Sequence, residues 1–272
     1  MPHQSTGFHE RVVVITGAAR GMGRAYADAF LERGAHVVGL DRAWDDALSK
    51  GLSLTTDVTS TSAIAEAFEQ TLARFGTVDV LINNAALRQR DLYPPHGAAA
   101  VLDTLDEHWR HMFDINVFGV LKVIRQFVRP MLDQRRGSIV NVSSGGSVGR
   151  AVEDGVWDGR NPAFRNQPYD ASKAALTNMS FYLADELKPH NVAVNVVFPA
   201  GTRTTGSDEM VAGRQALGIR VGSLLRPEHV VPLVVHLASQ DSSGDTGKAF
   251  DAVQWNMRHG HGSPDAWLAH PH

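Results

Sequence analysis

The stretch from residue 12 to residue 31 constrains the fold most strongly. Four β-branched apolar residues (12–15) are followed by glycines at positions 17, 21 and 23, and residues 24–31 then place apolar side chains at helical spacing. A short run that is apolar on both faces and closed by glycine is typical of a buried parallel strand. The sequence therefore predicts a strand, a glycine turn and a helix.

This unit suits the binding of a diphosphate. The start of a helix presents free N–H groups and the positive end of the helix dipole. Glycine also lets the backbone approach phosphate oxygens without a Cβ in the way. For so short a motif, a glycine-rich turn without a ligand is the alternative interpretation.

The next strand, residues 35–40, ends in Asp41. An acidic residue 20 to 25 positions beyond such a turn can accept hydrogen bonds from the adenosine ribose of NAD, and it repels the 2′-phosphate of NADP. Arg20 and Arg42 favour the opposite choice, because arginines near this place can hold a phosphate. We expect NAD, because Asp41 stands at the tip of the strand.

Composition narrows the class of protein. The chain has 272 residues, 43% of them hydrophobic, a formal net charge of −3 and no cysteine. This excludes disulfides and cysteine chemistry and argues against nucleic acid as the main partner. No apolar run approaches the ~18 residues of a membrane span, and residues 1–10 lack the apolar core of a signal peptide. We expect a cytoplasmic protein with no metal site, although four histidines cluster in the tail.

Further strands and helices alternate along the chain. Strands are predicted at residues 52–56, 78–82, 137–142, 192–198 and 249–250, and helices at 61–75, 105–132, 169–187 and 227–238. Such alternation predicts an α/β fold with a doubly wound, parallel, Rossmann-type sheet in a three-layer α/β/α arrangement. We expect residues 1–272 to form a single domain, with an irregular insertion at 145–168, a substrate loop at 200–225 and a tail at 254–272.

Polar residues follow the predicted strands at their carboxyl ends, where ligands bind in sheets of this kind. Tyr169 and Lys173 open the helix over 169–187 and share one of its faces, since they are four residues apart. Asn116 falls inside the helix predicted over 105–132, where asparagine is unfavourable. Either a site or a satisfied interior amide would explain it.

Taken together, these residues resemble the short-chain dehydrogenase/reductase family, in its compact single-domain branch. The resemblance covers roughly residues 8–251. It rests on a set of motifs that is specific in this order and spacing: Thr16-Gly17-x-x-x-Gly21-x-Gly23, Asp57, Asn83-Asn84-Ala85, Asn116, Ser144, Tyr169-x-x-x-Lys173, and Pro199 with Thr204.

The resemblance implies a role for each position. The glycine turn would hold the diphosphate, Asp57 and Val58 the adenine, and Pro199 and Thr204 would flank the nicotinamide. The implied cofactor-binding residues are Thr16, Gly17, Arg20, Gly21, Met22, Gly23, Asp41, Arg42, Asp57, Val58, Asn83, Asn84, Ala85, Tyr169, Lys173, Pro199, Thr202 and Thr204.

The implied catalytic residues are Asn116, Ser144, Tyr169 and Lys173. Tyr169 would be the acid/base, Lys173 would hold the nicotinamide ribose and lower the pKa of the phenol, Ser144 would orient the substrate oxygen, and Asn116 would anchor a water. A free phenol titrates near pH ~10, so a neighbouring ammonium is expected to favour phenolate.

The sequence departs from the family pattern at a few places. Ala86 and Ala200 stand where glycine is usual, and the segment between Ser144 and Tyr169 is about a dozen residues longer than usual. Because this insertion blurs the count back from the tyrosine, Ser143 rivals Ser144. We expect the insertion and the 200–225 loop to wall the substrate pocket.

The predicted function is that of an NAD-dependent oxidoreductase that interconverts a secondary alcohol, with cyclic alcohols and polyols among the candidates, and a ketone. The alternatives are an NADPH-dependent carbonyl reductase and a catalytically silent NAD-binding sensor or scaffold. Arg160 or Arg165 is a candidate for binding a carboxylate, and Trp157 for stacking on a ring. We expect a homotetramer or homodimer, with Trp255 and Trp267 of the tail packed on a neighbouring subunit.

Overall fold

The computed structural model describes residues 7–148, 150–151, 157–158 and 165–269. Its centre is a seven-stranded sheet in the order β3-β2-β1-β4-β5-β8-β9, in which every neighbouring pair is parallel. The predicted doubly wound α/β fold is thus confirmed. The strands are β1 (Val12–Thr16), β2 (His36–Asp41), β3 (Leu52–Thr55), β4 (Val80–Asn83), β5 (Gly137–Val142), β8 (Val192–Phe198) and β9 (Lys248–Asp251).

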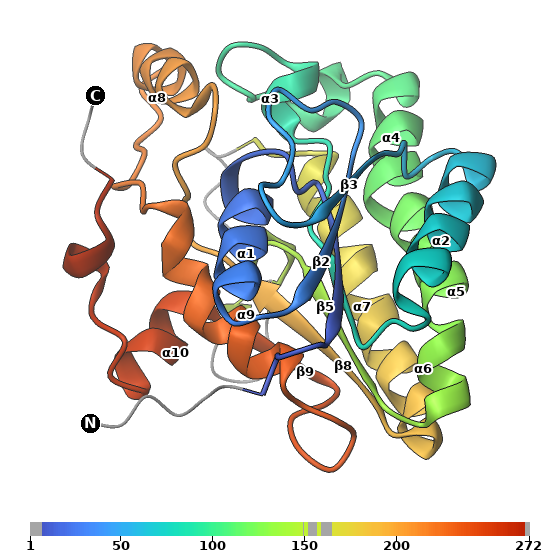
Figure 1. The fold of residues 1–272 in the computed structure, drawn as a ribbon. Coiled ribbons are helices and arrows are strands. Elements are labelled where there is room, and N and C mark those ends of the chain that lie inside the picture. Colours follow the sequence, from blue (N-terminus) through green and yellow to red (C-terminus); the bar gives the residue numbers. More distant parts are fainter. Residues whose placement is uncertain (1–6, 149, 152–156, 159–164, 270–272) are drawn as a thin grey trace.

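Helices cover both faces of this sheet (Figure 1). One face carries α1 (Gly21–Glu32), α9 (Val231–Ala238) and α10 (Ala252–Arg258). The other carries α2 (Thr61–Phe75), α4 (Asp106–Phe113), α5 (Val120–Phe127), α6 (Arg129–Gln134) and α7 (Tyr169–Leu187). The three predicted layers follow from this arrangement.

Alternation along β1 divides the core between the two faces. Val12 and Val14 belong to the apolar cluster under α2, α5 and α7, whereas Val13 and Ile15 belong to the cluster under α1 and α9. All four side chains are buried. The run that looked apolar throughout in the sequence therefore supplies both cores, as expected for a central parallel strand.

The continuous helix predicted over residues 105–132 is wrong. The segment divides into α4, a π turn (Asp114–Gly119), α5 and α6, with Pro130 in the first turn of α6. The fully buried side chain of Asn116 lies in the π turn and bonds to Leu87 outside the helix. A π turn is a common way to accommodate such a site within a helix.

Two stretches predicted as loops contain helices. The stretch after β4 includes α3 (Gln89–Leu92), and the 200–225 loop includes α8 (Ser207–Ala216). The 145–168 insertion has a 3₁₀ turn (Gly145–Ser147) and a two-stranded antiparallel pair, β6 (Arg150–Ala151) and β7 (Trp157–Asp158). Arg160 and the ring contacts expected for Trp157 lie outside the described residues.

The expectation that Trp255 in the tail packs on a neighbouring subunit is wrong, because this residue packs in its own subunit. Trp255 on α10 is 8% exposed and joins the core under α1 and α9, and its ring stacks with His259 and His261. Trp267 lies beside the guanidinium of Arg226. Trp255 is therefore unavailable to a neighbouring subunit. Among the helices described, none is both long enough and apolar enough to cross a membrane.

Candidate active site

A cavity of about 820 Å³ opens at the carboxyl edge of the sheet. This volume is near the upper end of the ~300–1,000 Å³ typical of ligand pockets. The predicted site residues that line it come from six strand ends with the loops after them and from the start of α7. They are Gly17, Arg20, Gly21, Met22, Asp41, Arg42, Asp57, Val58, Asn84, Ala85, Ser144, Tyr169, Lys173, Pro199, Thr202 and Thr204.

The glycine turn fits the close approach of a diphosphate. Gly17 and Gly21 have φ of 67° and 60°, a backbone region that side chains other than glycine rarely adopt. A Cβ on Gly23 would lie 2.0 Å from the carbonyl oxygen of Gly17, so helix and turn pack without room for a side chain. The backbone around residues 17–22 thereby forms a wall of the cavity that a dinucleotide could contact directly.

Asp41 is held in place at the end of β2. Its carboxylate accepts hydrogen bonds from the backbone N–H of Ala19 at 3.0 Å and from that of Arg42 at 2.8 Å. Arg20 and Arg42 also line the cavity, and neither forms an ion pair with Asp41 in the described part of the chain. The carboxylate of Asp41, which favours NAD, and the guanidinium groups of Arg20 and Arg42, which favour NADP, thus lie at the same end of the cavity.

Four predicted site residues are not brought to the cavity: Thr16, Gly23, Asn83 and Asn116. One of them, Thr16, supports the wall of the cavity from behind. The hydroxyl oxygen of Thr16 accepts from the N–H groups of Asn84 and Ala85, each at 3.0 Å. The side chain of Asn83 turns to the next strand instead and donates to Asn141 at 2.8 Å.

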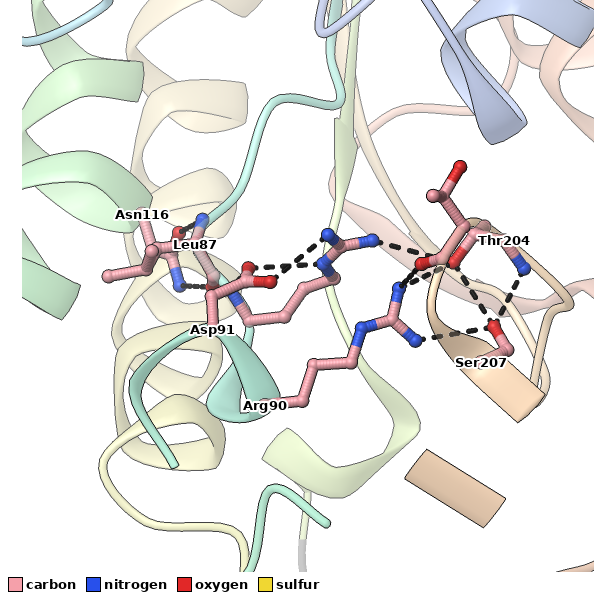
Figure 2. A network of polar contacts seen from close by, with 8 residues as sticks. Leu87, Arg90, Asp91, Asn116, Thr204 and Ser207 are labelled. Atoms are coloured by element: carbon pink, nitrogen blue, oxygen red, sulfur yellow. Dashed lines mark hydrogen bonds and ion pairs between the residues drawn. The ribbon is translucent and has the colours of Figure 1, made fainter. Parts of the chain in front are cut away.

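Asn116 links three elements. Its amide accepts from the N–H of Leu87 at 2.8 Å and donates to the carbonyl of Leu87 at 3.0 Å (Figure 2). It also donates to the hydroxyl of Ser172 at 3.0 Å. The alternative of a satisfied interior amide describes this side chain well. It fixes the start of the loop after β4 against α7.

Tyr169 begins α7 and faces the cavity. Gln89, which is buried on α3, accepts from the backbone N–H of Tyr169 at 3.2 Å and donates to the carbonyl of Gln167, so the two segments are tied together. Burial raises the pKa of the Tyr169 phenol above its usual value, and Asp170 raises it further. The cations of Arg88 and Arg90 lower it.

Lys173 lies one turn further along α7. Its ammonium is 5.8 Å from the centre of the Tyr169 ring and donates to the carbonyl of Val142 at 2.9 Å. The side chain is 2% exposed, and burial lowers its pKa to about 8. The sequence pairs the phenol with this ammonium. In the structure, however, the Lys173 ammonium donates to the main chain, and Arg88 and Arg90 are the cations that lower the pKa of the phenol.

The structure distinguishes the two serines at the end of β5. Ser143 is buried, and its hydroxyl bonds to the carbonyl of Lys173 at 3.0 Å and to the hydroxyl of Thr177 at 2.7 Å. The Ser144 oxygen accepts from the N–H of Gly146 at 3.1 Å, and no described residue accepts its proton. Ser144 is therefore better placed to donate to a ligand.

Sequence reasoning missed the arginines that line the substrate half of the cavity, Arg88, Arg90 and Arg214. Arg90 donates to the hydroxyls of Thr204 and Ser207 at 2.9 and 3.2 Å, which joins the loop after β4 to the loop after β8 (Figure 2). The signal was present: Arg88, Arg90 and Asp91 lie in the segment that follows the strand tip at residues 83–85, which had already been assigned to the site.

No metal centre is seen in residues 7–148 and 165–269. These residues contain no group of three histidine, aspartate or glutamate side chains that could hold an ion. The arginine, serine, tyrosine and lysine side chains that line the cavity suit binding and proton transfer.

Comparison with known families gives one broad match. A family model described as short chain dehydrogenase matches residues 11–215, which include every strand of the sheet except β9. The matched region contains all of the predicted site residues.

Individual relatives match over most of the chain. The sequence is 42% identical to a fluoren-9-ol dehydrogenase of Terrabacter sp., over 96% of this chain and 75% of that protein. It is 34% identical to a cis-4-hydroxycyclohexanecarboxylate dehydrogenase of Sinomonas cyclohexanicum, over 87% of this chain and 92% of that protein. A crystal structure of a short-chain type dehydrogenase/reductase from Mycobacterium marinum superposes with a TM-score of 0.73 at 27% identity, over 90% of this chain and 95% of that one.

Proposed function

Because this chain belongs to the short-chain dehydrogenase family, we propose that it is an NAD-dependent oxidoreductase that interconverts a secondary alcohol on a ring and the matching ketone. The observation that carries the proposal is the position of Tyr169 and Lys173 on one face of α7, lining the same cavity as the glycine turn. The two relatives that are named as dehydrogenases of ring alcohols support the substrate class.

The cofactor would lie along the carboxyl edge. The backbone of residues 17–22 would hold its diphosphate, Asp41 its adenosine ribose, and Asp57 and Val58 would border its adenine. When bound, the nicotinamide supplies the acceptor or donor of the hydride. Because the carboxylate of Asp41 is already fixed by two backbone N–H groups, it can accept from ribose hydroxyls with little reordering.

In this proposal Tyr169 exchanges a proton with the substrate oxygen. Burial raises the pKa of its phenol, so the hydroxyl stays protonated at neutral pH and is ready to act as an acid toward a ketone. Acting as a base toward an alcohol requires positive charge near the ring, which Arg88 and Arg90 supply in part. The hydroxyl of Ser144 would donate a hydrogen bond to the same substrate oxygen and so orient the substrate.

The test is Tyr169→Phe, which removes the hydroxyl and little else. A positioned acid/base typically contributes 10²–10⁴-fold, so turnover of fluoren-9-ol or cyclohexanol with NAD should fall at least 100-fold. NAD affinity, measured by fluorescence titration, should change less than threefold. A variant that keeps most of its turnover would refute the role of Tyr169, and a wild-type protein that binds NAD without oxidising any ring alcohol would favour the sensor alternative.

An NADPH-dependent carbonyl reductase is the second candidate, because Arg20 and Arg42 line the adenosine end. We expect NADH to bind at least tenfold more tightly than NADPH, since Asp41 repels a 2′-phosphate. Asp41→Ser should narrow this difference, while Asp28→Ser, on an exposed face of α1, should leave it unchanged. Tighter binding of NADPH by the wild type would favour the reductase.

A further inference from the structure

The substrate half of the cavity holds one cation whose charge is not balanced. Arg88 pairs with Asp91 through two contacts of 3.1 Å. Arg90 lines the same wall, yet no carboxylate within the described ranges lies at ion-pair distance from it. The two arginines are therefore unlike in their surroundings, although only Gln89 separates them.

The hydrogen bonds of Arg90 leave part of its guanidinium unused. Nη1 donates to the Ser207 hydroxyl, and Nη2 donates to the Thr204 hydroxyl and to the carbonyl of Thr205. These acceptors are neutral, and they account for three of the five N–H groups. Neither Nε nor the second N–H of Nη1 meets an acceptor among the residues that the structure places.

The charge of the Arg90 guanidinium would be stabilised by a bound anion. Burial and the neighbouring charge of Arg88 lower the pKa of Arg90 to about 10, so the group remains charged at neutral pH. A partly buried charge is costly unless it is paired, and a guanidinium edge matches a carboxylate in geometry. No carboxylate among the described side chains forms an ion pair with Arg90, whereas the carboxylate of a bound ligand could.

The segment that carries Arg90 is fixed relative to Tyr169. Gln89 is 3% exposed and bonds to the backbone of Tyr169 and Gln167, and Asn116 holds Leu87. Arg90 itself is tied to the loop after β8 (Figure 2). A ligand whose hydroxyl meets Tyr169 would thus find the guanidinium at a set distance from its reacting carbon.

We propose that the natural substrate carries a carboxylate away from its reacting hydroxyl and that Arg90 binds this carboxylate. This inference rests on the proposed function and narrows its substrate class to hydroxy acids on a ring. Arg90 is then a residue that determines specificity. The carboxylate would accept from one of the unused N–H groups, and the ties to Thr204 and Ser207 would keep the guanidinium in place.

The test compares two substrates that differ by one charge, cis-4-hydroxycyclohexanecarboxylate and its methyl ester, with saturating NAD. In the wild type, kcat/KM for the acid should exceed that for the ester at least tenfold. Arg90→Gln should lower this ratio at least tenfold, mostly through KM of the acid. Arg125→Gln, which removes an exposed arginine of α5, should leave the ratio unchanged.

Two further variants separate charge from loop anchoring. Ser207→Ala removes one acceptor of Arg90 but keeps the cation, so the acid should remain preferred. Arg90→Lys keeps the charge without the fork and should retain part of the preference. A Ser207→Ala variant that loses the preference as completely as Arg90→Gln would overturn the proposal, because the effect would then come from the loop.

A binding measurement tests the carboxylate-binding role of Arg90 separately from the proposed dehydrogenase activity. Calorimetric titration with the unreactive cyclohexanecarboxylate should give a Kd at least tenfold weaker for Arg90→Gln than for the wild type, whereas NAD should bind both alike. Equal use of acid and ester by the wild type would overturn the inference and leave the proposed function standing. Binding of the carboxylate without any turnover would overturn the proposed function and leave the carboxylate-binding role of Arg90 standing. Weaker NAD binding by Arg90→Gln would assign the guanidinium to the cofactor and overturn the inference.

Discussion

At the scale of single residues, Lys173 is the side chain in which stability and function oppose each other most clearly. Its ammonium is 2% exposed and has a carbonyl as its partner, and burial lowers its pKa from the usual 10.5 to about 8. At about 1.4 kcal/mol per pH unit, this difference corresponds to about 3 kcal/mol of destabilisation while the group is charged. A site that needs a cation in a dry place bears this cost in every folded molecule.

Lys173→Met should therefore raise the free energy of unfolding at pH 7 and abolish turnover. Between about pH 8 and 10.5 the unfolded chain binds the lysine proton and the folded wild type does not, so wild-type stability rises with pH across this window. The advantage of the variant should shrink there by up to about 1.4 kcal/mol per pH unit. Urea unfolding of both proteins at pH 7, 8, 9 and 10 measures this.

Lys50→Met is the matched control, since Lys50 is exposed in the turn before β3. Its curve should run parallel to that of the wild type. Parallel curves for Lys173→Met as well would mean that the ammonium is not destabilised by burial.

Residue-level prediction worked where a motif fixes a backbone position. The positive φ angles of Gly17 and Gly21 and the strand-tip position of Asp41 follow from local spacing alone. It failed where a role depends on distant partners. Asn83 is directed to Asn141, and Arg90 meets a loop more than 110 positions away, and no local pattern encodes either contact.

At the scale of elements, the strands and the long helices could be read from the sequence because their apolar periodicity is strong. The helix α2 begins after Ser60, whose hydroxyl accepts from the backbone N–H of Ala63, and its bounds match the helix predicted over residues 61–75. The helix α8 was not predicted because it is short and largely polar, although acidic residues such as Asp208 and Glu209 in a first turn are a recognised signal of a helix start. The π turn was not predicted because hydrophobic spacing alone cannot distinguish it from an α-helix.

The helix α8 borders the cavity, and Arg214 ties it to the loop after β4, in addition to the contacts of Ser207 with Arg90 and of Asp208 with Arg203. Arg214 is 6% exposed and donates to the carbonyls of His96 and Gly97 at 2.7 and 3.1 Å. Arg214→Ala should free α8 from that loop. Cleavage by Glu-C protease at Glu209 should accelerate at least fivefold, and KM for the alcohol should rise more than KM for NAD.

Arg214→Lys retains a donor and should give intermediate cleavage, and Arg129→Ala, on the exposed surface of α6, should match the wild type. Unchanged cleavage in Arg214→Ala would show that α8 is held by other contacts. The result would then place the substrate loop among the rigid parts of the molecule.

At the scale of the whole molecule, the C-terminal tail belongs to the body of the subunit. Trp255 packs in the core beneath α1 and α9, and the N–H of Arg226 donates to the carbonyl of Trp267 at 2.8 Å. Deleting the tail would therefore damage the fold and could not report on assembly. A surface for self-association has to be sought elsewhere.

The π turn and α7 offer such a surface. Phe118 is 51% exposed, and Phe181 and Tyr182 on the adjoining α7 are 40% and 68% exposed. Exposed aromatic side chains gathered on neighbouring elements are typical of interaction surfaces. A homodimer or homotetramer, as we expect for this chain, would cover these rings.

The double substitution Phe118→Asp and Phe181→Asp should therefore lower the molar mass in solution, as measured by light scattering. Two carboxylates placed in an apolar contact lose their water without gaining partners, whereas exposed carboxylates on a monomer cost little. Circular dichroism should be unchanged, because neither ring is part of the core. Leu217→Asp, at a residue 55% exposed after α8, serves as control and should keep the mass of the wild type. If the double variant also keeps that mass, subunits do not meet through α7, and the exposed rings must serve another contact.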